Sequence, residues 1–219
     1  MTDLVTRNPA DAARGLSRRS VMKGAAWSVP VIVASAAAPM AVASVNNAGL
    51  AWTSSNTGLL TLGILDSASL VTAQTLVTVP TQLTITNGSG AISGESATVQ
   101  ITVGRPSGIP ITVGRARGFG VRQFDGASTP SGSRTATYQS APIVGQFGFP
   151  LTTYSTTVPV TIAANGSLNI PVQFGLAGNS TGLTIAALAD FPVTTIVTIG
   201  GRTLTAATTI SVPVGAGIL

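Results

Sequence analysis

Alternation of apolar and polar residues is the feature that most constrains the fold of this 219-residue chain. From Ala97 to Val103 every second residue is apolar, and the residues between them are Thr or Gln. Because a strand points successive side chains to opposite faces, this segment predicts a β-strand with one buried face. About ten short segments of this kind, separated by turn residues every 8 to 12 positions, predict an all-β protein with antiparallel strands.

Three turns between such segments predict β-hairpins, because Asn-Gly and Gly-Gly pairs tolerate the positive φ that tight turns require. The expected turns are Asn87-Gly88-Ser89-Gly90, Asn165-Gly166 and Gly200-Gly201. Further strands are expected at 60–64, 109–113 and 119–124. Pro159 and Pro171 lack an amide hydrogen, so each is expected at an edge or at a position without a backbone hydrogen bond.

Residues 83–90, followed by 98–103, form an apolar-Thr segment, an Asn-Gly turn and a Val-rich partner. This sequence resembles the opening strands of immunoglobulin-like modules in bacterial surface proteins. The resemblance implies an immunoglobulin-like antiparallel β-sandwich. The same periodicity fits a barrel, and the irregular middle section at 104–150 also allows two small sandwiches in place of one.

The first 43 residues carry a second resemblance. Ser17, Arg18 and Arg19, followed by two apolar residues and Lys23, resemble the twin-arginine export signal. An apolar, Ala-rich run follows, and Ala41-Val42-Ala43 has the pattern of a cleavage site, with Ser44 as the first mature residue. The alternatives are cleavage after Ala36-Ala37-Ala38 and retention of the run as a membrane anchor.

The export resemblance implies that the chain is secreted or held in the cell envelope. It implies the twin-arginine translocon and a signal peptidase as partners during export, and the Ala-rich leader is similar to those of actinobacterial proteins. The expected organisation is therefore a signal peptide at 1–43 and a single sandwich domain at 44–219.

Composition excludes several kinds of chemistry. Residues 44–219 contain no Lys, His or Cys, so they lack the usual bases and nucleophiles of hydrolases and the nitrogen and sulfur ligands of metals. We therefore expect no catalytic residue, no metal and no cofactor. Six arginines and four acids give this part a net charge of +2, compared with +5 for the whole chain, which is too small to indicate nucleic-acid binding.

A carbohydrate-binding or carbohydrate-acting module is the alternative function. It would use acidic residues with nearby aromatic residues, since a glycosidase needs two carboxylates facing one cleft. The acidic residues are Asp66, Glu95, Asp125 and Asp190, and the aromatic residues are Tyr138, Phe147, Phe149 and Tyr154. Each carboxylate also has a simpler role at a turn or at the start of a strand.

A candidate contact surface lies in the irregular middle section, where arginine and aromatic residues are interleaved. Its residues are Arg115, Arg117, Arg122, Phe119 and Phe124. In the alternative, the arginines solvate one face of a sheet while both phenylalanines enter the core. The sequence thus favours an exported, non-enzymatic, immunoglobulin-like protein that is a structural or adhesive component, with an envelope polymer or protein as its partner.

Overall fold

The computed structural model describes residues 47–73, 76–106, 118–137, 149–177, 185–186, 190–212 and 217–218. The strands are β1 Gly49–Gly58, β2 Thr61–Gly63, β3 Leu70–Thr72, β4 Val77–Thr86, β5 Ile92–Val103, β6 Gly118–Phe124, β7 Ala127–Ser128, β8 Arg134–Thr137, β9 Leu151–Ile162, β10 Ser167–Ala177, β11 Ile185–Ala186, β12 Asp190–Ile199, β13 Arg202–Ser211 and β14 Gly217–Ile218. A single 3-10 turn, η2, covers Ser131–Ser133 within the described ranges. The expected all-β class is confirmed.

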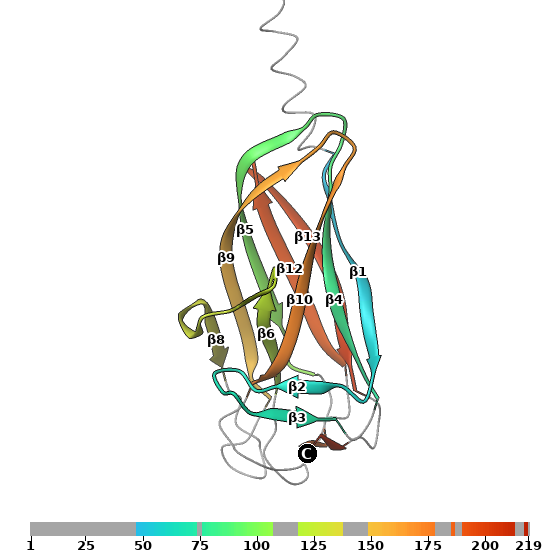
Figure 1. The fold of residues 1–219 in the computed structure, drawn as a ribbon, viewed down its shortest axis with the longest axis vertical. Coiled ribbons are helices and arrows are strands. Elements are labelled where there is room, and N and C mark those ends of the chain that lie inside the picture. The colour runs from blue at the N-terminus through green and yellow to red at the C-terminus, as the bar shows by residue number, and fades with distance from the viewer. Residues whose placement is uncertain are drawn as a thin grey trace, which may run out of the picture. The chain divides into compact units, whose positions relative to one another are not determined.

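Ten strands form one curled antiparallel sheet (Figure 1). Its order is β7-β6-β10-β4-β13-β12-β5-β9-β8, and β1 pairs with β4. Two small sheets, β2-β3 and β11-β14, and an isolated parallel bridge between Ile64 and Leu176 complete the pairing among the described residues. Strands that precede residue 104 pair directly with strands that follow residue 150, since β4 pairs with β10 and β5 pairs with β9.

The β12-β13 hairpin forms as expected at Gly200-Gly201. Both glycines have positive φ, 54° and 74°, which suits the twist of a two-residue hairpin turn. The ladder is continuous from Ile199 opposite Arg202 to Asp190 opposite Ser211. On its other edge, β12 pairs with β5, so the hairpin lies within the sheet.

The other two predicted hairpins are wrong, although their strands are present. β4 forms no ladder with β5, and β9 forms none with β10. Instead the two connections are arches that lie against each other, so that β4 pairs with β10 and β5 pairs with β9. The amide of Asn87 donates to Gly166 O at 2.9 Å, and the amide of Asn165 donates to Gly88 O at 2.7 Å.

The side chain of Asn87 joins the two arches. Its buried Nδ2 donates to Gly90 O at 2.6 Å in its own arch, and lies 3.0 Å from Ala163 O and 3.3 Å from Ile162 O of the other arch. A local hairpin would break these bonds between arches, which is a physical reason for the observed pairing.

Pro171 lies where one ladder ends and the next begins, and Pro159 lies where β9 is paired on one edge only. Pro171 is the last residue of β10 that pairs with β4, and from Val172 onward β10 pairs with β6. Pro159 in β9 pairs with β5 through Ser96, while β8 pairs with β9 only from Leu151 to Tyr154. Both positions agree with the expectation for a residue that cannot donate a backbone hydrogen bond.

The core lies inside the curled sheet and is built from the alternate residues of its strands. In β5, Ala97, Val99, Ile101 and Val103 are buried, as their periodicity predicts. Trp52 of β1 crosses this interior: its Nε1 donates to Thr195 Oγ1 of β12 at 3.2 Å, and its ring lies 5.8 Å from that of Phe174 in β10. Strands that are distant in the sheet order are thus joined by side chains.

Several predictions lie outside the described residues. These are the export motif Ser17, Arg18, Arg19 and Lys23, the cleavage residues Ala41, Ala43 and Ser44, and the strand expected at 109–113. The strand expected at 119–124 is confirmed as β6. The turn expected at Asp66 is also present, between β2 and β3.

Candidate functional site

The candidate contact surface is contradicted at two of its residues. Phe119 and Phe124 are buried, with 1% and 4% of their surface exposed, so neither is available to a partner. The Phe119 ring packs against Phe191, and Phe124 packs against Tyr154. Both side chains lie on the inner face of β6. This agrees with the alternative interpretation of the sequence, in which both phenylalanines enter the core. Arg115 and Arg117 lie outside the described residues.

Arg122, the remaining residue of that surface, is half-buried against β2 and β10. A Cβ added to Gly63 would lie 2.3 Å from Arg122 Cζ, so the guanidinium rests directly on the glycine. A Cβ on Gly175 would lie 2.5 Å from Gly63 O and 3.2 Å from Arg122 Cβ. The two glycines therefore let the β2 backbone and the arginine pack on β10, which gives Arg122 a structural role.

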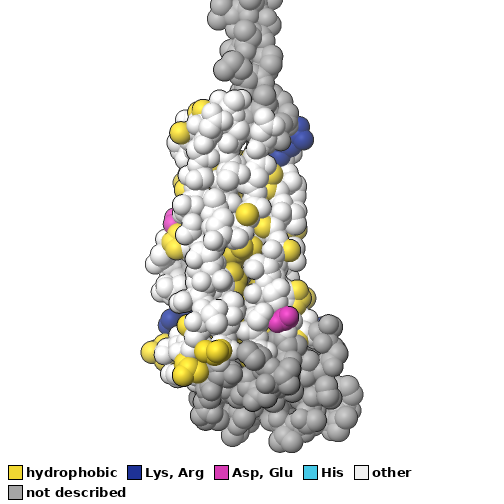
Figure 2. Space-filling view, turned by 90° about the vertical axis from the view of Figure 1, so that its right-hand side faces the viewer, with side chains coloured by type: hydrophobic (Ala, Val, Ile, Leu, Met, Phe, Trp, Pro, Cys, Tyr) yellow, Lys and Arg dark blue, Asp and Glu magenta, His cyan; other side chains and the backbone are white. Residues whose placement is uncertain are grey.

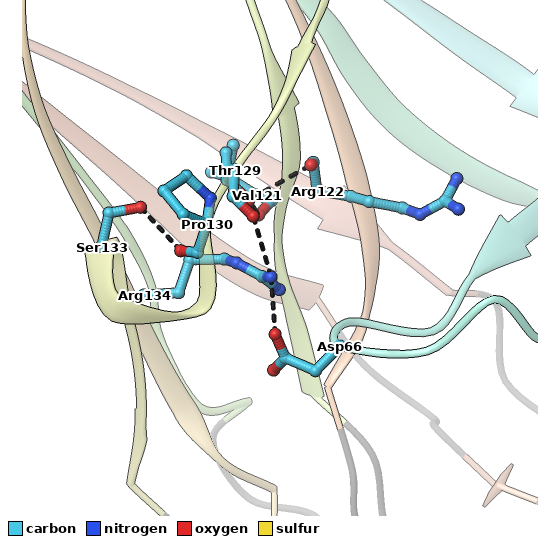
Figure 3. A network of polar contacts seen from close by, with 7 residues as sticks. All are labelled: Asp66, Val121, Arg122, Thr129, Pro130, Ser133 and Arg134. Carbon is cyan, nitrogen blue, oxygen red and sulfur yellow. Dashed lines mark hydrogen bonds and ion pairs between the residues drawn. The ribbon is translucent and has the colours of Figure 1, made fainter.

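Arg134 forms a polar network with the turn between β2 and β3 (Figure 3). Its Nη2 donates to Asp66 Oδ1 at 2.7 Å and to Thr129 O at 2.9 Å. The Thr129 hydroxyl donates to Val121 O at 2.8 Å, and Arg122 extends away from the cluster. The network thus attaches the β2-β3 turn to the loop before η2.

The Arg134 side chain is 11% exposed, whereas that of Asp66 is 59% exposed. Nε and Nη1 of Arg134 are buried and find no hydrogen-bond acceptor among the described residues. Asp66 also has a positive φ of 62°, a conformation that Asp adopts more readily than most residues. The ion pair is open to solvent on its acidic side, so we assign it a role in positioning the turn.

The four carboxylates take turn and strand-end positions. Asp125 has a φ of 50° and precedes Gly126 in the β6-β7 turn, and its amide donates to Pro171 O. Glu95 and Asp190 lie toward opposite ends of the β5-β12 ladder, roughly 35 Å apart at the usual rise per residue. That separation is too large for the carboxylate pair of a glycosidase.

The aromatic platform of the alternative function is contradicted at two residues. Tyr154 and Phe149 are buried, and the Phe149 ring packs edge-on against Phe191. Neither presents a flat exposed ring to a sugar, because each points into the core. Tyr138 and Phe147 lie outside the described residues. In the part that the structure describes, no three His, Cys, Asp or Glu side chains gather to hold a metal ion.

Three exposed leucines form the apolar feature that the sequence did not single out. Leu59, Leu70 and Leu76 are 62%, 61% and 55% exposed. Leu59 follows β1 and Leu76 precedes β4, next to the paired residues Gly58 and Val77. Leu70 begins β3. Figure 2 shows hydrophobic side chains at this end of the described part, and others along the same face.

The leucines were missed because alternation marks buried positions, and each of them lies just outside a ladder or at its end. The usable signal was the pair Leu59-Leu60 after Gly58, since one of two consecutive residues must point away from the core. In the structure Leu60 packs against the core and Leu59 is exposed. We call Leu59, Leu70 and Leu76 the leucine patch.

No protein-family model matches this chain, and no curated protein matches it significantly. Within the described ranges, no helix has the length and apolar character needed to cross a membrane.

Proposed function

We propose that this chain is an exported, non-enzymatic, immunoglobulin-like β-sandwich protein that acts as a structural or adhesive component of the cell envelope. The leucine patch is the observation that carries the proposal. Large exposed apolar side chains favour contact with another molecule, because covering them removes apolar area from water. We therefore propose the leucine patch as the contact surface, in place of Phe119 and Phe124.

The sandwich form is supported by contacts across the interior of the curled sheet. Trp52 of β1 bonds to Thr195 of β12 and packs against Phe174 of β10. One arch connects β4 to β5, yet β4 pairs with β10 and β5 pairs with β9. Strands joined by a connection between two facing sheets are expected to pair in this way. The carbohydrate alternative loses support, because Tyr154 and Phe149 are buried.

The leucine patch gives the first prediction. Replacing Leu59, Leu70 and Leu76 together with Ser should move most of the envelope-retained protein into the medium, because the patch loses its apolar area. The measurement is quantitative immunoblotting of medium, wall and membrane fractions. The matched control replaces Thr98, Thr157 and Thr198 with Ala, since these three exposed residues adjoin one another across β5, β9 and β12. Equal retention of both variants would exclude the patch as the contact.

The export signal gives the second prediction. Replacing Arg18 and Arg19 with Lys keeps the charge but removes the twin-arginine motif, so the precursor should remain inside the cell. N-terminal sequencing of the exported wild-type protein should begin at Ser44. Export of the double variant at the wild-type level would contradict the proposed route. An intact N-terminus in the membrane fraction would instead make the run after Lys23 an anchor.

A further inference from the structure

The small β2-β3 hairpin has a buried face and an exposed face. Leu62 lies on the buried face and packs into the core. On the exposed face Thr61 pairs with Thr72, and their hydroxyl oxygens lie 3.3 Å apart. Gly63 pairs with Leu70. Because paired residues of an antiparallel ladder project to the same face, Leu70 lies on the exposed face together with the two threonines.

The guanidinium of Arg122 lies on this exposed face, directly over Gly63. A Cβ added to Gly63 would lie 2.3 Å from both Cζ and Nε of Arg122, and 2.6 Å from its Nη1. The Cβ atoms of opposed residues in such a ladder are about 5 Å apart, so the Leu70 side chain begins beside the guanidinium. The hairpin therefore presents a cation and an exposed leucine next to each other.

The charge of Arg122 is not neutralised within the part of the chain that the structure describes. Its side chain makes no hydrogen bond and no ion pair there. In Figure 3 it extends away from Asp66, and that carboxylate is already bound by Arg134 at 2.7 Å. Two arginines and one aspartate give this region a net charge of +1. Asp125 lies beyond the other end of β6, away from the hairpin.

The leucine patch extends along the hairpin. Leu70 begins β3, whereas the other two leucines lie past the opposite end of the hairpin, where β1 ends and β4 begins. The hairpin bonds continue from Leu70 to Ala73, whose amide donates to Leu60 O at 2.9 Å. These residues cover about 10 Å of chain. A partner that contacts the whole patch and the guanidinium together must therefore present an extended surface.

We propose that the leucine patch and Arg122 bind the surface of an anionic phospholipid bilayer. The leucines enter the boundary between headgroups and acyl chains, and the guanidinium donates to lipid phosphate oxygens. A bilayer is extended, apolar below its surface and anionic at its surface, so it suits every part of this face. A soluble phosphate would leave the leucines in water, and an uncharged apolar surface would leave Arg122 without a counter-ion.

This proposal names the partner of the leucine patch and rests on the contact role proposed above. Each apolar side chain that leaves water favours binding, and a basic residue near an anionic bilayer adds to it. Three leucines and one arginine make a small contact, so the binding is reversible. It can be measured with purified protein and synthetic vesicles, without export or cell fractions.

The test places a fluorescent reporter in the patch of the full chain. The chain contains no cysteine, so Leu70→Cys gives a single site for an environment-sensitive dye. Vesicles of equal parts phosphatidylglycerol and phosphatidylcholine should shift the dye emission to shorter wavelength, and pure phosphatidylcholine vesicles should bind more weakly. The matched control carries the dye at Gln100→Cys, because Gln100 is exposed on β5, which is paired on both edges. Its emission should not shift, and binding through residues 1–43 alone would shift neither dye.

Arg122→Gln in the labelled chain tests the charge. It should lower the partition coefficient onto the phosphatidylglycerol vesicles about fivefold, the contribution expected of one basic residue at an anionic surface. Arg122→Lys keeps the charge and should keep most of the binding. Arg202→Gln is the matched control: Arg202 begins β13, about 30 Å from Ser211, which pairs with Thr78 beside the patch. It should bind like the labelled parent, and thermal unfolding by circular dichroism checks that every variant is folded.

Three results would overturn the bilayer as the partner. The first is a dye at Leu70→Cys that does not shift with any amount of phosphatidylglycerol vesicles. The second is a folded Arg122→Gln variant that partitions no more weakly than Arg202→Gln. The third is a shift caused by inorganic phosphate or soluble polyphosphate without vesicles, which would make the ligand a soluble anion.

These results are independent of the fractionation that tests the proposed function. If the leucine-to-serine variant is released into the medium while the dye does not shift, the patch keeps its contact role and the bilayer is not its partner. If both fractionation variants are retained equally, the contact role itself fails. Failure of the bilayer assignment is therefore distinguishable from failure of the proposed function.

Discussion

Replacing Phe191 with Ala is expected to lower the free energy of unfolding by about 3 to 5 kcal/mol, the range for truncating a buried phenylalanine. Phe191 is fully buried in β12, and its ring contacts two others edge-on. Its centroid lies 5.0 Å from that of Phe119 in β6 and 5.4 Å from that of Phe149, before β9. The ring therefore joins three separate segments of the chain.

The expected loss is a large share of the total stability of a small domain, which is about 5 to 15 kcal/mol. The measurement is urea unfolding followed by fluorescence, with the free energies of the variants compared at equal m-values. Phe191→Leu should lose clearly less, because it leaves a smaller cavity. Leu59→Ala, at an exposed position, should change stability by less than about 0.5 kcal/mol. A Phe191→Ala loss below that of Phe191→Leu would contradict the packing described above.

Replacing Asn87 with Asp is expected to destabilise the protein by about 3 kcal/mol or more, although the two side chains have nearly the same shape. The Nδ2 of Asn87 lies within 3.3 Å of three carbonyl oxygens, from Gly90, Ile162 and Ala163. A carboxylate oxygen at this position would replace the donor with a buried negative charge among acceptors. Losing this donor and placing a negative charge against carbonyl oxygens is among the costliest single changes.

Asn87→Ala should cost less, about 1 to 3 kcal/mol, because it leaves acceptors unpaired without adding a charge. Asn165→Asp is the matched control: Asn165 is exposed in the β9-β10 arch with a φ of 54°, which Asp also tolerates. Its stability should stay within about 0.5 kcal/mol of the wild type. If the two Asp variants unfold at the same urea concentration, the Asn87 side chain does not hold the arches together.

The strands themselves could be predicted from local sequence. In β5, β9, β10, β12 and β13, alternation identified the buried face, because only one face of a strand can turn away from water. The β12-β13 hairpin was also predictable, since Gly200 and Gly201 both take the positive φ that a two-residue turn demands. In each case the deciding interaction lies between residues close in sequence.

The candidate site could be predicted far less well. Phe119 and Phe124 sit beside arginines in the sequence, and the structure places them on the buried face of β6. The leucine patch collects residues from the β1-β2 connection, the start of β3 and the β3-β4 connection, and Arg134 reaches Asp66 across 68 positions. Exposure and contact over such separations depend on which strands pack together, and period-two alternation carries no information about that.

The sequence by itself determined the all-β class, most strand positions, the buried faces and the absence of Lys, His and Cys after residue 43. The tertiary structure decided the partners of the strands. Asn87-Gly88 and Asn165-Gly166 are compatible with either a hairpin or an arch. The bonds of Asn87 to the other arch favour the arch, and they exist only once both connections meet. Local turn chemistry limits the backbone angles, whereas bonds between distant segments select the pairing.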